Sequence, residues 1–159
     1  MRNDHLTPRD TPISAGETAP DFTLLNQHRE EVSLKSLLAR GGDVVLSFYP
    51  LDFTSVCTTE MTCLSRDLAK FTGKGAQVVG ISCDSFAAHK AFAEQEGLAI
   101  PLLADMHRQV CRAYGLYWAD LNVAQRGTVV VGPDGVVKWA EAREPGNAFK
   151  LDALLGQVG

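Results

Sequence analysis

The sequence predicts a layered α/β domain built on a mixed β-sheet and flanked by helices, in three layers. Two observations carry this prediction. Compact apolar runs at 44–49 and 77–82 each precede a segment of helical periodicity, which is typical of parallel strands joined through helices. Nearer the C-terminus, two apolar runs flank a Gly-Pro-Asp-Gly turn at 132–135, which predicts an antiparallel hairpin in the same sheet.

Turn and cap residues divide the rest of the chain into short elements. In chain order we expect a hairpin at 22–25 and 31–33, a helical turn at 34–39, a helix at 57–71, a helix from 84 or 85 to 96, an extended piece at 101–103, a helix at 105–114, hairpin strands at 128–131 and 136–140, and a last helix from Asn147.

Length and composition indicate one globular domain. The chain has 159 residues with 45% hydrophobic and 21% charged residues, which is enough for one sizeable core. We expect a flexible leader at 1–14 and a single domain at 15–159. The net charge of −4 argues against a nucleic-acid surface, and no apolar stretch has the length of a membrane span. With no apolar signal segment at its N-terminus, the chain is predicted to be cytoplasmic.

Cys57 lies where a predicted strand gives way to a predicted helix. The run 44–49 ends shortly before it, and Met61, Leu64 and Leu68 then fall on one face of a helix. A cysteine in the first turn of a helix meets free backbone N–H groups and the positive end of the helix dipole, and both favour the reactive thiolate. Ligands of such sheets bind beyond the carboxyl ends of parallel strands, so Cys57 is a candidate nucleophile in the expected place.

The remaining candidate ligands form no metal pattern. Cys57, Cys63, Cys83 and Cys111 include no C-x-x-C pair and no Cys/His spacing of a zinc site. The four histidines are scattered, and we expect them to be solvated. We therefore predict free thiols, as in a reducing compartment, with no cofactor and no metal.

Several motifs resemble those of peroxiredoxins, which are thiol peroxidases with a thioredoxin-like fold. Pro50, Thr54 and Cys57 match the family pattern P-x-x-x-T-x-x-C, and Arg126 matches an arginine placed just before a late strand. The resemblance covers roughly residues 14–155. Within the family, Pro50–Thr54 and Arg143–Asn147 are most similar to the AhpE-type group, followed by the bacterioferritin-comigratory group. The resemblance also includes 20–22, 79–82 and 132–135.

The resemblance implies reduction of hydrogen peroxide and organic hydroperoxides through a sulfenic acid on Cys57, in antioxidant defence. Arg126 would hold the sulfur and a peroxide oxygen, since an arginine stays charged and offers several donors. Thr54 would hydrogen-bond the thiolate or the peroxide, and an ordinary helix N-cap is the alternative. Pro50 would shape the loop and shield the sulfur. For Glu60, orientation of the arginine and ordinary first-turn helix chemistry both stay open.

Reduction of the sulfenic acid has two candidate routes. The positions where the bacterioferritin-comigratory group places a resolving cysteine are Thr62 and Ala93 here. Cys63 could reach Cys57 only if their helix unwinds, whereas Cys83 follows a strand at the correct edge of the sheet. Cys111 is interpreted as a core residue. We favour an external thiol over a second cysteine of the chain.

The predicted partners follow from this chemistry. They are a hydroperoxide substrate and a reductant that is a low-molecular-weight thiol, a glutaredoxin-like protein or thioredoxin. The resemblance also implies a homodimer, with Trp118 near its edge; Phe48, Tyr49, Phe53 and Trp118 are candidates for contacts with organic hydroperoxides, the core or the dimer. The alternatives are a thiol–disulfide oxidoreductase, which would normally need C-x-x-C, and a redox-sensing module on the same fold.

Overall fold

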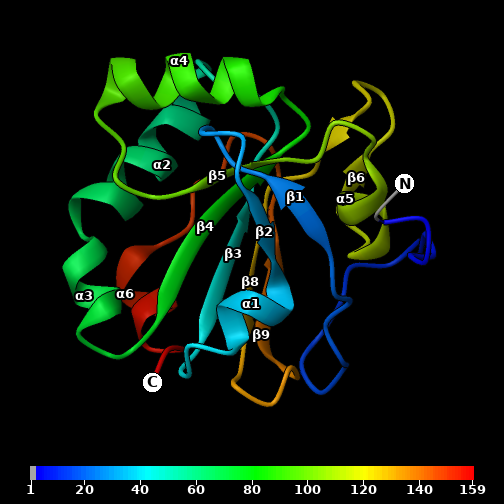
Figure 1. Ribbon diagram of the computed structural model, residues 1–159, viewed down its shortest axis with the longest axis vertical. Coiled ribbons are helices and arrows are strands. Elements are labelled where there is room, and N and C mark those ends of the chain that lie inside the picture. The colour runs from blue at the N-terminus through cyan, green and yellow to red at the C-terminus, as the bar shows by residue number, and fades with distance from the viewer. Residues whose placement is uncertain (1–2) are drawn as a thin grey trace.

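The computed structural model describes residues 3–159, which form a seven-stranded sheet and a separate two-stranded sheet (Figure 1). The strands are β1 (Thr23–Leu25), β2 (Glu31–Ser33), β3 (Val44–Phe48), β4 (Gln77–Ser82), β5 (Leu102–Ala104), β6 (Tyr117–Trp118), β7 (Val123–Ala124), β8 (Gly127–Val131) and β9 (Val137–Ala142). The helices are α1 (Leu34–Leu38), α2 (Ser55–Arg66), α3 (Leu68–Thr72), α4 (Phe86–Glu96), α5 (Gln109–Ala113) and α6 (Leu151–Leu155).

The large sheet is mixed, as predicted. Its order is β2-β1-β5-β4-β3-β8-β9. Strands β3, β4 and β5 run parallel, whereas β8 pairs antiparallel with both β3 and β9. The predicted Gly-Pro-Asp-Gly turn joins β8 to β9, and Gly135 adopts the positive φ of 82° that the turn requires. The carboxyl ends of β3 and β4 therefore lie side by side, at the edge where Cys57 was expected.

Helices cover both faces of this sheet, which confirms the three-layer α/β prediction. Because side chains alternate along a strand, Val45 of β3 belongs to one buried cluster and Val44 to another. The first cluster contains Cys57, and we call its side of the sheet the Cys57 face; the second contains Cys111 and defines the Cys111 face. Buried side chains on the Cys57 face come from α2, α3, α4 and α6, and those on the Cys111 face come from α1 and α5.

Three predicted helices have different bounds in the structure. The helix expected at 57–71 begins at Ser55 and is broken at Asp67, whose backbone leaves helical geometry. The helix expected from 105 shortens to α5, because Asp105 accepts hydrogen bonds from the first turn instead of joining it. The last helix begins at Leu151, since the backbone at 145–149 bonds to buried side chains. Strands β6 and β7 were not predicted.

The N-terminal segment makes specific contacts with the domain. Asn3 exchanges two hydrogen bonds of 2.9 Å with the backbone of Thr23 at the start of β1. Ile13 donates its backbone N–H to Tyr114 and lies in the core of the Cys111 face. Residues 1 and 2 lie outside the described part, and flexibility of the 1–14 leader stays a prediction.

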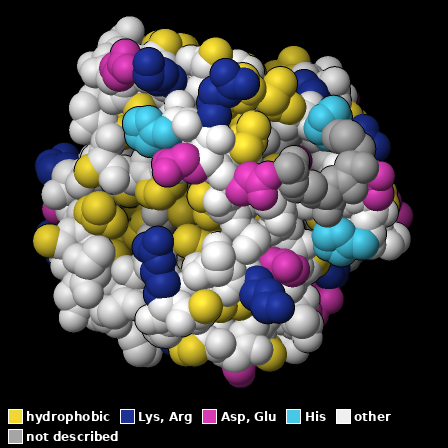
Figure 2. Space-filling view, viewed as in Figure 1, with side chains coloured by type: hydrophobic (Ala, Val, Ile, Leu, Met, Phe, Trp, Pro, Cys, Tyr) yellow, Lys and Arg dark blue, Asp and Glu magenta, His cyan; other side chains and the backbone are white. Residues whose placement is uncertain are grey.

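Charged side chains of both signs are interspersed on the face seen in Figure 2. Within residues 3–159, no helix is long and apolar enough to cross a membrane.

Candidate active site

Cys57 lies in the first turn of α2, as the sequence predicted. Thr54 is the N-cap of this helix, in extended geometry, so Cys57 is its third residue. The 12-residue helix aligns its peptide dipoles toward this end, where the first N–H groups have no helical partner. Cys57 is nevertheless only 1% exposed. Its sulfur therefore depends on the surrounding protein, rather than on water, to stabilise negative charge.

Arg126 supplies a positive charge at this sulfur. It stands between β7 and β8, and its Nη2 donates to Cys57 Sγ over 3.2 Å. Its Nε donates to the carbonyl of Pro145 over 2.9 Å. The contact places a buried positive charge directly against the sulfur, where its attraction for negative charge is little screened by water.

A carboxylate and a second arginine hold Arg126 in place. Glu60, one turn beyond Cys57, accepts from Arg126 Nη1 over 2.5 Å through one oxygen. Its other oxygen accepts from Arg143 Nη2 over 2.8 Å and from the backbone N–H of Phe149 over 2.9 Å. Glu60 is fully buried and contacts both guanidinium groups, which supports its role in orienting the arginine.

The charges of this cluster do not cancel without the sulfur. Two guanidinium groups, of Arg126 and Arg143, face one fully buried carboxylate, that of Glu60. Glu141 also pairs with Arg143 over 3.3 Å, but its side chain is about half exposed and is screened by water. An ionised Cys57 would compensate the remaining buried positive charge.

The four predicted site residues line one pocket of about 190 Å³. Pro50 and Thr54 come from the loop after β3, Cys57 from α2 and Arg126 from the residue just before β8. The other residues that line it are Leu51, Ser55, Val56, Trp118 and Pro145. The walls are largely apolar around one thiol and one guanidinium, so the pocket suits a small polar molecule with at most a modest apolar substituent.

Thr54 has a more specific geometry than the sequence suggested. Its hydroxyl donates to the carbonyl of Leu51 over 2.8 Å and makes no capping bond to α2. The hydroxyl proton is thus engaged, while the oxygen keeps lone pairs that can accept a hydrogen bond. In this conformation Thr54 can accept a hydrogen bond from a ligand O–H but does not donate one to the sulfur.

A buried polar network fixes the loop that carries Pro50 and Thr54. Tyr49 Oη donates to Asp52 over 2.7 Å, and the other Asp52 oxygen lies 2.7 Å from His89 Nδ1. His89 Nε2 lies 3.1 Å from the carbonyl of Leu103 in β5. His89 is fully buried, so the prediction that all four histidines are solvated is wrong for it. Burial and the carboxylate of Asp52 raise the pKa of Tyr49 well above its ordinary value.

The aromatic candidates separate into three groups. Trp118 lines the pocket, whereas Phe48 and Tyr49 are fully buried in the core. Phe53 is 49% exposed, has a positive φ of 66° and packs its ring against Phe92 at 5.2 Å. Trp118 is thus the aromatic side chain placed to contact a substrate.

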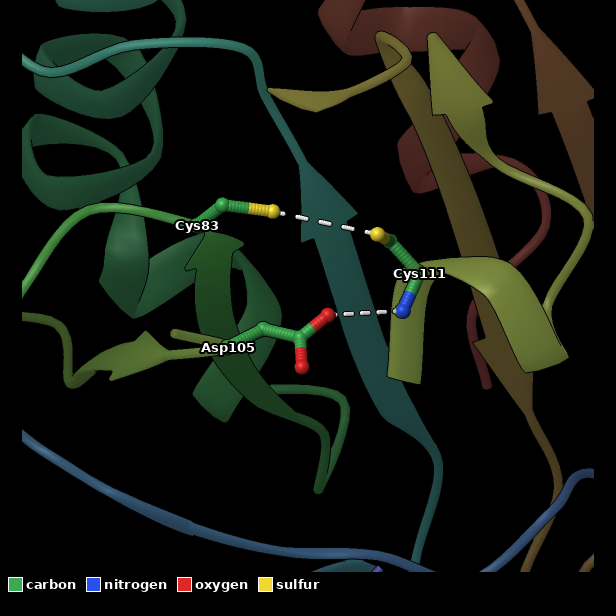
Figure 3. Close-up of side chains that lie close together, drawn as sticks. All are labelled: Cys83, Asp105 and Cys111. Atoms are coloured by element: carbon green, nitrogen blue, oxygen red, sulfur yellow. Dashed lines mark hydrogen bonds between the residues drawn. The ribbon is translucent and has the colours of Figure 1, made fainter. Parts of the chain in front are cut away.

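All four cysteines are free thiols, and the structure does not pair Cys57 with another one. Cys63 is half-buried on α2, and burial raises the pKa of its thiol. Cys83 belongs to the Cys111 face, where its sulfur lies 3.8 Å from that of Cys111 (Figure 3). The anticipated proximity of Cys83 to Cys57 is therefore not found; its neighbour is Cys111.

Sequence analysis did not assign a role to Arg143. Its pentapeptide, 143–147, carried the subfamily resemblance, and this was the only signal for it. In the structure Arg143 bonds to Glu60, Thr128 and the carbonyl of Asn147. Arg143 bonds to the Glu60 carboxylate, which in turn bonds to Arg126, so Arg143 is connected to the Cys57 sulfur only through these two residues.

A buried thiol in contact with a guanidinium, at the carboxyl end of a parallel strand, is an arrangement suited to thiol redox chemistry. The sequence matches the model of the AhpC/TSA family over residues 15–140, and the chain belongs to this family.

Two similar sequences and one similar crystal structure support this family membership. Alkyl hydroperoxide reductase E of Mycobacterium tuberculosis is 38% identical over 137 residues, covering 84% of this chain and 88% of the relative. Peroxiredoxin tpx1 of Schizosaccharomyces pombe is 40% identical over 136 residues, covering 79% and 70%. The crystal structure of peroxidoxin BcpB from M. tuberculosis superposes with a TM-score of 0.84 at 29% identity, covering 91% of this chain and 96% of that one.

These similarities establish the enzyme class. The chain is a peroxiredoxin with a thioredoxin-like fold, and it reduces hydroperoxides at the expense of thiols. A thiol–disulfide oxidoreductase or a redox-sensing module, the alternatives considered from the sequence, is not favoured.

Proposed function

We propose that Cys57 is the peroxidatic nucleophile and that Arg126, Thr54 and Pro50 complete the catalytic site. The observation that carries this proposal is the 3.2 Å contact between Arg126 Nη2 and Cys57 Sγ. It belongs to a buried cluster in which positive charge exceeds negative charge unless the sulfur is ionised. The reaction needs a thiolate, so the cluster matches the chemistry.

The proposed step transfers one oxygen atom. The Cys57 thiolate attacks the terminal oxygen of a hydroperoxide, a sulfur–oxygen bond forms and the O–O bond breaks. The transferred oxygen keeps its proton, so Cys57 becomes a sulfenic acid, and the leaving alkoxide or hydroxide takes a proton from water. Two electrons pass from sulfur to the peroxide.

Three side chains assist this step. Arg126 stabilises the negative charge that moves from the sulfur to the leaving oxygen. Thr54 Oγ1 accepts the O–H of the terminal oxygen, since its own proton is directed to Leu51. Pro50, with Trp118, limits access of water to the pocket.

For the second half-reaction we propose an external reductant. Cys63 shares α2 with Cys57, and both Cys83 and Cys111 belong to the opposite face of the sheet. None of them can reach a Cys57 sulfenic acid without rearrangement. A low-molecular-weight thiol, a glutaredoxin-like protein or thioredoxin would therefore attack the sulfenic sulfur, forming a mixed disulfide and releasing water. A second thiol of the reductant would then attack this mixed disulfide, which regenerates the Cys57 thiol and leaves the reductant as a disulfide. Such reductants and four free thiols suit the cytoplasm.

A homodimer is the proposed assembly. Leu51 and Phe53, on the loop beside the pocket, are 36% and 49% exposed, and burial of such side chains favours association. Sedimentation equilibrium of the wild type and of Phe53→Ser tests this proposal. A monomeric wild type at micromolar concentration would contradict it.

One equivalent of hydrogen peroxide, followed by a sulfenic-acid trap and intact-mass spectrometry, tests the proposed function. Wild type and Cys63→Ser should each carry one adduct, whereas Cys57→Ser should carry none. A disulfide between Cys57 and another cysteine would overturn the external-reductant route, and lack of any Cys57-dependent change would overturn the assignment of the nucleophile.

A further inference from the structure

We propose that Cys83 and Cys111 form a second redox site, a dithiol that closes to an intramolecular disulfide independently of Cys57. Figure 3 shows the two side chains pointing toward each other, Cys83 from the end of β4 and Cys111 from α5. Their sulfurs lie 3.8 Å apart in direct contact. This inference concerns the Cys111 face of the sheet and goes beyond the peroxidase site on the other face.

The distance is short enough for closure by small movements. A disulfide bond is about 2.05 Å long, so the sulfurs must approach by about 1.8 Å. Cys83 follows the last residue of β4 and takes no part in strand pairing, so a shift of its backbone need not break the sheet. Closure therefore needs rotation of side chains and a local shift, not a rearrangement of the sheet.

Asp105 anchors the partner that moves less. Its carboxylate accepts the backbone N–H of Cys111 over 2.8 Å and that of Val110 over 3.2 Å. The first turn of α5 is thereby fixed beside the end of β5, with the Cys111 sulfur directed at Cys83. The Asp105 carboxylate thereby holds α5 in a position in which the Cys111 thiol faces the Cys83 thiol.

The surroundings of this pair should make it react with peroxide more slowly than Cys57. The hydrogen bond to Cys83, burial and the nearby Asp105 raise the pKa of the Cys111 thiol far above its ordinary value. Cys83 is 8% exposed, whereas Cys111 is fully buried. Cys83 is thus the first to meet an oxidant, and Cys111 closes the bond.

The oxidant is a hydroperoxide, which the established activity already encounters. The Cys83 thiolate attacks one peroxide oxygen and becomes a sulfenic acid, while the leaving hydroxide takes a proton. The Cys111 sulfur then attacks the Cys83 sulfur, the sulfur–oxygen bond breaks, and the thiol proton leaves with the hydroxyl as water. Two thiols and one hydrogen peroxide yield one disulfide and two waters.

Peptide chemistry can test the pair without ambiguity. Cleavage after Lys and Arg puts Cys57 and Cys63 together in peptide 41–66, Cys83 in 75–90 and Cys111 in 109–112. A link between the last two peptides therefore identifies the proposed bond. Cys57→Ser is the protein to use, because it lacks the proposed peroxidatic thiol and separates this test from that of the proposed function.

The experiment begins with reduced Cys57→Ser, whose mass is first measured under native conditions. After incubation with excess hydrogen peroxide, we expect a loss of two hydrogen atoms, a fall in titratable thiols from three to one, and the link between 75–90 and 109–112. Cys57→Ser/Cys63→Ser should show the same loss. Two double variants serve as matched controls and should not lose the two hydrogen atoms. They are Cys57→Ser/Cys111→Ala and Cys57→Ser/Cys83→Ser, and one suffices if the other folds poorly.

Two results would overturn the proposal. One is oxidation of Cys83 to sulfinic or sulfonic acid while Cys111 stays a thiol, which would mean that the sulfurs do not close. The other is a metal ion retained by the native protein and released only with a chelator, since Cys83, Cys111 and Asp105 place ligand atoms within 4.8 Å of one another. That result would assign the cluster to metal binding.

Discussion

Cys57 and Cys111 are equally buried, yet their surroundings have opposite electrostatic character. They are 1% and 0% exposed and lie on opposite faces of one sheet. The neighbour of Cys57 is the guanidinium of Arg126, at 3.2 Å. The neighbours of Cys111 are another thiol and the carboxylate of Asp105. Because both sulfurs are buried, the difference between them lies in the charged groups within a few ångströms, a guanidinium at one and a carboxylate at the other.

The largest effect expected from this comparison is on peroxide consumption. Cys57→Ser should reduce thiol-dependent turnover of hydrogen peroxide to the background rate, because the nucleophile is lost. Cys111→Ala should retain the wild-type kcat/KM, since its sulfur lies on the other face. A peroxide electrode or a dye-based assay measures both, and loss of activity in a folded Cys111→Ala would break the comparison.

Glu60→Gln tests the balance of charge behind Cys57. This change removes the one fully buried carboxylate that pairs with both Arg126 and Arg143, which should lower the free energy of unfolding by about 3–5 kcal/mol. Urea denaturation followed by circular dichroism measures the loss. Glu94→Gln, on the exposed face of α4, is the matched control and should stay close to wild type. Equal stability of the two variants would mean that the cluster is not held by its charges.

Arg126→Gln removes the charge but keeps a hydrogen-bond donor near the sulfur. We expect kcat/KM for hydrogen peroxide to fall by about 10²–10³-fold, the usual range for loss of one transition-state donor. Arg112→Gln, an exposed arginine stacked on Tyr117, is the control and should not change the rate. A fall of similar size in both would point to a general effect of net charge.

Asp105→Asn tests the surroundings of Cys111. The amide oxygen can replace only one of the two carboxylate oxygens that accept hydrogen bonds from α5, so the free energy of unfolding should fall by about 1–3 kcal/mol. Removal of the negative charge should also increase the alkylation rate of Cys111 by iodoacetamide. Peptide mass spectrometry over time gives this rate. Asp120→Asn, an exposed change in the following loop, should leave the rate unaltered.

The smallest effect expected is on stability at alkaline pH. The raised pKa of Cys111 means that the folded protein keeps this thiol protonated, while the unfolded chain loses the proton above its ordinary pKa of 9.0. The contribution is therefore complete below pH 9 and is lost as pH rises further. At pH 10, one unit above that value, the loss should be on the order of 1 kcal/mol for this group. Urea midpoints between pH 7 and 10 should fall less in Cys111→Ala; parallel curves would contradict the prediction.

Part of the site could be predicted because it is local. Three consecutive elements depend on residues that are neighbours in the chain. They are a strand, a loop with Pro50 and Thr54, and a helix that starts just before Cys57. Arg126 was identified only through the family resemblance, which places an arginine just before a late strand. The hydroxyl of Thr54, directed to Leu51, could not be foreseen, because cap and ligand bonds use the same atoms.

The sequence by itself determined the layered α/β fold, the place of Cys57 in the first turn of a helix and the turn between β8 and β9, since short-range periodicity and turn chemistry specify them. Only the tertiary structure decided that Glu60 would bond to both Arg126 and Arg143, although Glu60 and Arg143 are 83 residues apart in the chain. It also decided that Cys83 would contact Cys111 instead of Cys57. These contacts depend on the order of strands in the sheet and on which face each side chain occupies. Periodicity sets the alternation of faces, but packing decides which distant side chains share one.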